Sequence, residues 1–154
     1  MLHIVLFNPE IPPNTGNVIR LCANTGFQLH LIEPLGFVME DKKLRRAGLD
    51  YHEWASVNVH DNWQAFIDAV QPARIFACET TGQCRHVDAR FAVGDALVFG
   101  PETGAVPAEL MSALPPEQTL RLPMRPGQRS LNLSNAVAVI AFEAWRQLEF
   151  SGAS

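Results

Sequence analysis

Short apolar runs alternate with amphipathic stretches along the whole chain. The run L-H-I-V-L-F at residues 2–7 is typical of a buried strand, whereas Trp63, Phe66, Ile67 and Val70 recur at helical spacing. By these criteria we expect strands at 2–7, 29–33, 56–59, 74–78, 96–99 and 119–122. We expect helices at 15–24, 41–47, 62–70, 107–114 and 131–150. The alternation predicts an α/β domain with a mostly parallel sheet flanked by helices.

The chain is expected to form one domain that covers residues 1–154, since it has no internal repeat, low-complexity tract or linker. Its longest uninterrupted apolar run, residues 136–142, is too short to cross a bilayer. The three cysteines form an odd set without a C-x-x-C pair, so we expect a reducing compartment, the cytoplasm.

The first predicted helix carries one arginine. Asn14 is predicted as its N-cap and Asn24-Thr25-Gly26 as its end. Apart from a stripe formed by Asn17, Arg20 and Asn24, the helix is apolar, so Arg20 faces either a thin strip of solvent or a cleft. An arginine in a cleft suits phosphates and other oxyanions, and the pattern leaves both alternatives open.

The last predicted helix is apolar all round at A-V-A-V-I-A-F, residues 136–142. Such a helix is either enclosed in the core or covered by another subunit. We expect a homodimer through this helix, because two-fold dimers are the commonest oligomers.

Three loops follow predicted strands and are rich in Gly, Pro or small polar residues. They begin after Cys78 (E-T-T-G-Q), after Phe99 (G-P-E-T-G-A-V-P) and after Leu122 (P-M-R-P-G-Q-R-S-L-N). Ligands of open parallel sheets bind beyond the carboxyl ends of the strands. The sequence therefore predicts a pocket formed by these three loops.

Familiar nucleotide and metal motifs are absent from the sequence. There is no G-x-G-x-x-G, no P-loop and no G-x-S-x-G elbow. The five histidines are scattered without H-x-x-x-H spacing, so we expect no metal site.

The charge is uneven. The net charge is −4, yet cations cluster at D-K-K-L-R-R and at R-L-P-M-R-P-G-Q-R. These clusters are either solvated surface or local binding sites for a polyanion, since salt screens distant charges. Their members are Lys42, Lys43, Arg45 and Arg46 in the first cluster and Arg121, Arg125 and Arg129 in the second.

Three segments together resemble the SPOUT superfamily of RNA methyltransferases. They are N-T-G-N-V-I-R (14–20), F-G-P-E-T (99–103) and S-L-N-L-S-N-A-V (130–137). In order and spacing they are most similar to the TrmL family of small tRNA methyltransferases, and the resemblance covers nearly the whole chain. It implies an α/β fold with a C-terminal trefoil knot, which general rules of topology disfavour.

The resemblance also implies the chemistry. S-adenosylmethionine would contact Cys78, Gly100, Leu122 and Ser130, largely through the backbone, and no metal would be needed. The motif side chains assigned to catalysis are Arg20, Asn14, Glu102 and Asn132. For Glu102, Ser130 and Asn132 the alternative is a role as helix or turn caps. The implied reaction transfers a methyl group to a ribose 2′-hydroxyl.

The implied substrate is the wobble pyrimidine of tRNA, cytidine or modified uridine 34, in leucine isoacceptors. Both basic clusters would then contact the anticodon stem-loop. The alternatives are another tRNA position or rRNA, a non-catalytic relative that binds cofactor or RNA, and a generic flavodoxin-like ligand binder. The chain departs from the family at Gly104-Ala105, where Arg-Gly is frequent, and at Phe142, where tyrosine occurs.

Overall fold

Seven parallel strands form one sheet in the computed structural model, which describes residues 1–154 except for the side chains of Asp41, Lys43 and Leu44. The strands follow the order β3-β2-β1-β6-β4-β7-β5. Their bounds are β1 (His3–Phe7), β2 (Gln28–Ile32), β3 (Asn58–His60), β4 (Ile75–Cys78), β5 (Cys84–Arg85), β6 (Ala96–Phe99) and β7 (Thr119–Arg121). The predicted α/β fold is confirmed.

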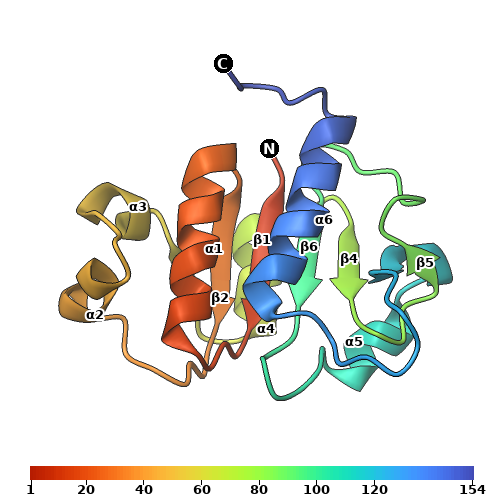
Figure 1. The fold of residues 1–154 in the computed structure, drawn as a ribbon, viewed down its shortest axis with the longest axis horizontal. Coiled ribbons are helices and arrows are strands. Elements are labelled where there is room, and N and C mark those ends of the chain that lie inside the picture. The colour runs from red at the N-terminus through yellow and green to blue at the C-terminus, as the bar shows by residue number, and fades with distance from the viewer.

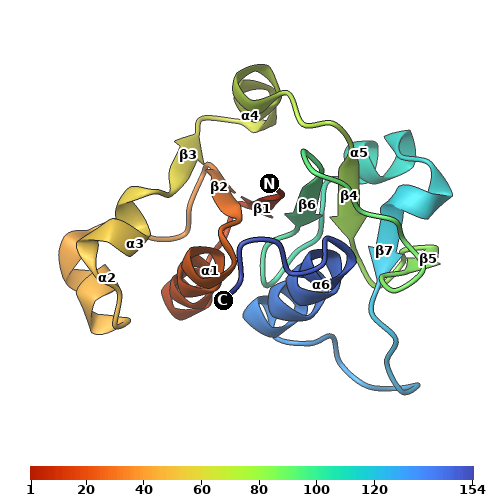
Figure 2. The same cartoon turned by 90° about the horizontal axis from the view of Figure 1, so that it is seen from above.

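Helices cover both faces of the sheet (Figures 1 and 2). On one face α1 (Pro12–Thr25) and α6 (Leu133–Gln147) lie side by side, and on the other lie α4 (Trp63–Val70) and α5 (Ala108–Ala113). Beyond β3, α2 (Asp41–Arg46) and α3 (Tyr51–Ala55) extend the molecule at one end. A short 3-10 helix, η1 (Pro116–Gln118), precedes β7. In the described chain no helix is both long and apolar enough to span a membrane.

Strand β1 shows why its sequence forms a central strand. Ile4 and Leu6 belong to the apolar layer beneath α1 and α6, whereas Val5 and Phe7 belong to the layer beneath α4. Successive side chains of a strand point to opposite faces, and a parallel sheet is covered on both. A continuous apolar run therefore fits this position.

The start of α1 differs from the prediction. The helix begins at Pro12, with Ile11 as N-cap, and Asn14 lies inside its first turn. The two prolines at 12 and 13 suit the first helical positions, where the backbone N–H has no helical partner. The predicted end is confirmed, because Gly26 caps the helix with a φ of 79°.

The connection between β4 and β5 passes over β7. The Glu79 N–H donates to the carbonyl of Leu120 at 2.9 Å, and the Gln83 N–H donates to that of Thr119 at 3.0 Å. Gly82 lies so close to β7 that an added Cβ would stand 2.2 Å from the Leu120 oxygen. Strand β7 thus lies between two strands that precede it in the sequence. The knot implied by the family resemblance stays a prediction.

Candidate functional site

A cavity of about 310 Å³ opens at the carboxyl edge of the sheet. The loops that follow β4, β6 and β7 line it together, as predicted, and the first turn of α6 completes the wall. All four positions expected to hold the cofactor line this cavity, namely Cys78, Gly100, Leu122 and Ser130.

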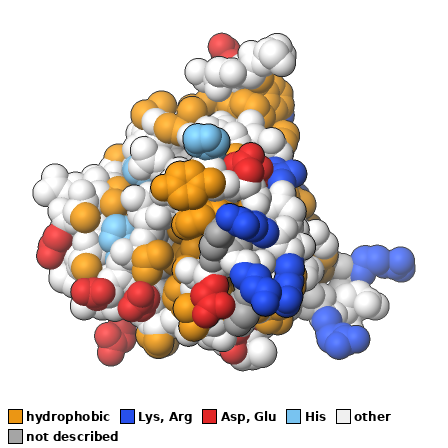
Figure 3. Space-filling model, turned by 90° about the vertical axis from the view of Figure 1, so that its left-hand side faces the viewer, with side chains coloured by type: hydrophobic (Ala, Val, Ile, Leu, Met, Phe, Trp, Pro, Cys, Tyr) orange, Lys and Arg blue, Asp and Glu red, His pale blue; other side chains and the backbone are white. Residues whose placement is uncertain are grey.

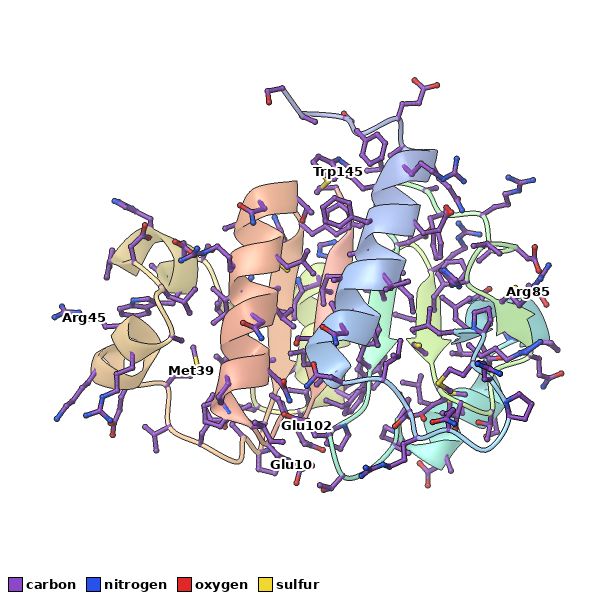
Figure 4. All side chains as sticks on the ribbon, viewed as in Figure 1. Glu10, Met39, Arg45, Arg85, Glu102 and Trp145 are labelled. Atoms are coloured by element: carbon purple, nitrogen blue, oxygen red, sulfur yellow. The ribbon has the colours of Figure 1, made fainter. Side chains whose placement is uncertain are left out.

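Glu102 joins the wall of the cavity to the start of α1. Its carboxylate accepts the backbone N–H groups of Glu10 at 2.9 Å and Ile11 at 2.7 Å. Glu10 reciprocates, because its carboxylate accepts the N–H of Thr103 at 2.9 Å and also the Thr103 hydroxyl. Figure 4 shows Glu10 and Glu102 close together below α1. A carboxylate suits the positive end of a helix dipole, so the paired loops fix this end of α1.

Asn14 and Asn132 extend this network to α6. The Asn14 amide donates to Glu102 at 3.3 Å, and its oxygen accepts the Asn132 amide at 3.0 Å. The Asn132 oxygen accepts the Ser134 N–H at 2.9 Å, so Asn132 is the N-cap of α6 while it also lines the cavity. Asn132 therefore has both roles that the sequence offered for it, since it caps a helix and also belongs to the wall of the cavity. Three of the four predicted catalytic side chains are brought together and hold one another in place.

Arg20 lies apart from them. It does not line the cavity, and it projects from α1 about 9 Å further along the axis than Asn14, at 1.5 Å per residue. Its Nε donates to the carboxylate of Glu53, and its Nη2 donates to the carbonyl of Gly48. The side chain is half exposed. Of the two surroundings that the sequence left open for Arg20, a strip of solvent or a cleft, the single chain therefore shows the strip of solvent.

Glu79 lines the cavity from the predicted loop E-T-T-G-Q, although the sequence assigned it no role of its own. It follows Cys78 directly, and its carboxylate accepts the backbone N–H of Val106. This contact joins the loop after β4 to the loop after β6. Burial raises the pKa of the Cys78 thiol to about 12, and the charge of Glu79 adds to the rise. Cys78 is therefore a neutral wall residue near neutral pH rather than a nucleophile.

The two basic clusters lie on either side of the outward face of α1. Lys42, Arg45 and Arg46 are exposed on α2, whereas the side chain of Lys43 lies outside the described residues. Arg125 and Arg129 are exposed on the loop that leads to Ser130. Figure 3 shows one group of cations near the middle of the α2 side and another projecting at its right-hand edge.

Arg121 does not line the cavity. It lies on β7 and lines a separate hollow of about 370 Å³ with Arg85 and Asp88. Arg121 stands in register with Arg85 of β5, and its place among the RNA-binding residues stays a prediction.

The cavity has the character of a site for a small polar organic molecule. Backbone-rich loops form its wall, apolar side chains such as Leu122 and Met124 lie in it, and the carboxylates of Glu79 and Glu102 stand at it. Its volume reaches the lower end of the range for ligand sites, about 300–1,000 Å³. Among the side chains that the structure describes, no group of three His, Cys, Asp or Glu is placed to hold a metal ion.

Comparison with known proteins agrees with this geometry. Residues 1–142 match the model of the SpoU rRNA Methylase family. The tRNA (cytidine(34)-2'-O)-methyltransferase of Aeromonas hydrophila is 60% identical over 152 residues, which cover 99% of this chain and 97% of the relative. A solved structure concerned with the 2-OH methylation of C/U34 on tRNA is 49% identical, with a TM-score of 0.88 and 97% of each chain covered.

A more distant solved structure shows the same fold with a ligand. It is the SpoU methyltransferase AviRb from Streptomyces viridochromogenes in complex with the cofactor AdoMet. That chain is 22% identical with a TM-score of 0.82, and the likeness covers 100% of this chain and 59% of that one. The match of the family model to most of the chain, together with the relative at 60% identity, shows that the chain belongs to the SpoU rRNA methylase family.

Proposed function

We propose that this protein is an S-adenosylmethionine-dependent tRNA 2′-O-methyltransferase that acts on the ribose of the wobble pyrimidine, cytidine or modified uridine 34, in leucine tRNAs. The observation that carries the proposal is the cavity enclosed by the loops after β4, β6 and β7, which contains every position expected to hold the methyl donor. The full-length similarity to relatives named for methylation of cytidine 34 supports the choice of substrate.

The cavity fits the proposed donor. S-adenosylmethionine supplies a methyl group on a positively charged sulfur. The backbone at Gly100, Leu122 and Ser130 would hold the polar groups of such a molecule, and the carboxylates of Glu79 and Glu102 bring negative charge to the same wall. Glu102, Asn14 and Asn132 would act by keeping the three loops and the start of α6 in place, since their polar atoms already bind one another.

Arg20 would hold the RNA. A guanidinium keeps its proton at any physiological pH, so Arg20 cannot serve as the base that accepts the hydroxyl proton. We assign it the role of binding a phosphate of the RNA or the reacting hydroxyl, while the proton leaves to a phosphate oxygen or to water. Its half-exposed position on the outward face of α1 suits a contact with a polyanion.

The exposed cations suit an anticodon stem-loop. The α2 cluster and the arginines at 125 and 129 lie on opposite sides of α1, so an RNA that contacts both crosses the face that carries Arg20. Phosphate contacts of this kind give binding that weakens as salt rises. A wobble nucleotide lies in an unpaired loop, where proteins reach individual nucleotides.

We also infer a homodimer and a cytoplasmic location. Val139 and Phe142 are 44% and 45% exposed on α6, which suits a face covered by a second copy. The cysteines Cys22, Cys78 and Cys84 are all free thiols, which suits a reducing compartment.

The test is to incubate purified tRNA with the protein and S-adenosylmethionine and to map 2′-O-methyl nucleosides by mass spectrometry. We expect a methylated pyrimidine at position 34 and a loss of roughly 100-fold in turnover with Arg20→Ala, because the RNA is no longer oriented. Arg85→Ala is the matched control, since Arg85 is also an exposed, carboxylate-paired arginine but lies on β5 at the far edge of the sheet.

One alternative has an observation of its own. The family description names rRNA, so ribosomal RNA is the second substrate to test. Methylation of rRNA but not of tRNA would replace the tRNA assignment. Cofactor binding without methylation of either RNA would favour a non-catalytic, RNA-binding relative.

A further inference from the structure

Arg20 is held by two groups that come from outside α1. The Nε–H donates to the Glu53 carboxylate on α3, and one Nη2–H donates to the carbonyl of Gly48 in the turn after α2. A guanidinium has five N–H groups in one plane. These contacts occupy one edge of that plane and fix its orientation, while 49% of the side chain stays exposed.

Glu53 is itself firmly placed. Its side chain is only 16% exposed. Its backbone N–H donates to the Asp50 carboxylate at 3.0 Å, which caps α3, and its carbonyl accepts the Ser56 hydroxyl at 3.0 Å. The backbone of Glu53 is therefore fixed, so its carboxylate has a defined position and can orient the guanidinium of Arg20. A carboxylate on a mobile loop could not do so.

The ion pair adds little stability, because solvent screens a pair whose arginine is 49% exposed. A negative charge beside a cation also weakens attraction for a polyanion, so the pair lowers the general affinity of this face for RNA. Glu53 instead fixes the orientation of the Arg20 guanidinium, because contacts at two of its N–H groups leave a single edge of its plane open.

We propose that Glu53 is a positioning residue for methyl transfer: together with the Gly48 carbonyl it holds Arg20 with its open edge toward an RNA phosphate. The proposal rests on the role of Arg20 given under the proposed function. The proposal also assigns a role to the turn between α2 and α3. This turn follows the cationic helix α2, and its Gly48 carbonyl helps to orient Arg20.

The changes in kcat and KM that we expect differ from those that a general loss of folding would cause. Glu53→Ala should lower kcat about tenfold, because Arg20 loses its orientation. The KM for tRNA should stay level or fall, because a negative charge has been removed beside the phosphate. Glu53→Gln keeps an oxygen acceptor for the Nε–H and should retain more of the kcat than Glu53→Ala.

The chain offers a control in the pair Asp88–Arg85, which lies at the far edge of the sheet. Its arginine is 54% exposed, close to the 49% of Arg20, so the two guanidinium groups are similarly solvated. Asp88→Ala should leave kcat and KM unchanged. An unchanged kcat in Glu53→Ala, or a fall in kcat that comes with a higher KM and equals the effect of Asp88→Ala, would overturn the proposal.

A spectroscopic measurement separates this proposal from the proposed function. The Nε–H resonance of Arg20, assigned by its loss in Arg20→Lys, should be sharp in the wild type, shift when tRNA is added, and broaden in Glu53→Ala. These changes support the positioning role even in a protein that methylates no tRNA. A resonance that is indifferent to Glu53→Ala, or to tRNA, rejects it whatever the methylation assay gives.

Discussion

The carboxylate of Glu102 receives three donors, the N–H groups of Glu10 and Ile11 and the amide of Asn14. The same residue lines the cavity, so a single side chain couples the stability of α1 to the shape of the site. Hydrogen bonds to a charged group contribute about 1.5–3 kcal/mol, more than those between neutral groups.

Glu102→Gln tests this coupling. A glutamine has one oxygen in place of two, so its amide must face one of the three donors, and we expect a loss of about 2 kcal/mol in the free energy of unfolding. For a chain of this size that corresponds to a fall of roughly 4–8 °C in Tm. S-adenosylmethionine affinity, measured by calorimetry, should fall as well.

The exposed Glu109 on α5 provides the control, because Glu109→Gln makes the same change of charge away from the cavity. A Glu102→Gln protein with the Tm and the ligand affinity of this control would contradict the coupling.

Sequence reasoning at the residue scale succeeded where a motif carried the information. Asn14, Glu102 and Asn132 were chosen together from three distant segments, and they are bonded to one another. The contacts of Glu53 and Glu79 were missed because their partners, Arg20 and Val106, lie 33 and 27 residues away along the chain. No local pattern reports such a contact, since the fold alone creates it.

Three neighbouring strands carry a row of histidines that no motif predicted. The Nδ1 of His3 lies 3.0 Å from the Nε2 of His30, and the Nδ1 of His30 lies 2.9 Å from the Nε2 of His60. Burial, with the neighbouring His3 and His60 rings, lowers the pKa of His30 to about 3, and burial also lowers the pKa of His3 and of His60. The row therefore joins β1, β2 and β3 in its neutral form.

This row of histidines makes the stability of the fold sensitive to acid. An unfolded histidine takes up a proton near pH 6.5, whereas folded His30 does so only near pH 3, so stability falls as pH drops from about 6.5 toward 3. At pH 5 we expect the wild type to lose roughly 1–2 kcal/mol relative to pH 8 through His30. Urea unfolding at both pH values measures the loss.

His30→Gln is the informative variant, because an amide can still bridge both neighbours but does not titrate in this range. Its unfolding free energy should depend less on pH than that of the wild type, by about the same 1–2 kcal/mol. Equal pH dependence in the two proteins would assign the acid sensitivity to other groups.

At the scale of elements, the periodicity of apolar residues predicted most strands and helices but not the short ones. Strand β5 and helix α3 were not predicted, because each is too short to show a period. The last helix ends at Gln147 rather than at residue 150, since Leu148 already caps it. The cap predicted at Asn14 was wrong for a physical reason: its side chain reaches Glu102 and Asn132 instead of its own helix.

An exposed apolar stripe on α6 concerns the whole molecule. Val139 and Phe142 lie about one turn apart on α6, and both are exposed. We expect the wild type to sediment at about 34 kDa, twice the 17.0 kDa of one chain, and Phe142→Glu to sediment as a monomer, since a dimer would bury the new charge.

Val87→Glu is the control, because Val87 is also 45% exposed but follows β5 at the far edge of the sheet. A wild type that sediments at 17.0 kDa, or a Phe142→Glu protein that stays dimeric, would rule out this interface.

The arrangement of the whole chain was only partly open to sequence reasoning. Because the carboxyl ends of parallel strands share one edge, the meeting of three loops in one cavity followed from the predicted elements. The order of the strands did not follow, since it depends on which connections cross the sheet. For that reason the hollow that Arg121 shares with Arg85 was not foreseen.

The position of β7 between β4 and β5 has a consequence for the making of the protein. A ribosome delivers β4, its short connection and β5 well before β7, and α6 follows β7. The cavity needs the loop after β7 and the first turn of α6, so a nascent chain has no complete site for a cofactor until these two segments have been made. Binding stabilises only a state that contains the site, which means that the methyl donor cannot guide the early folding of this chain.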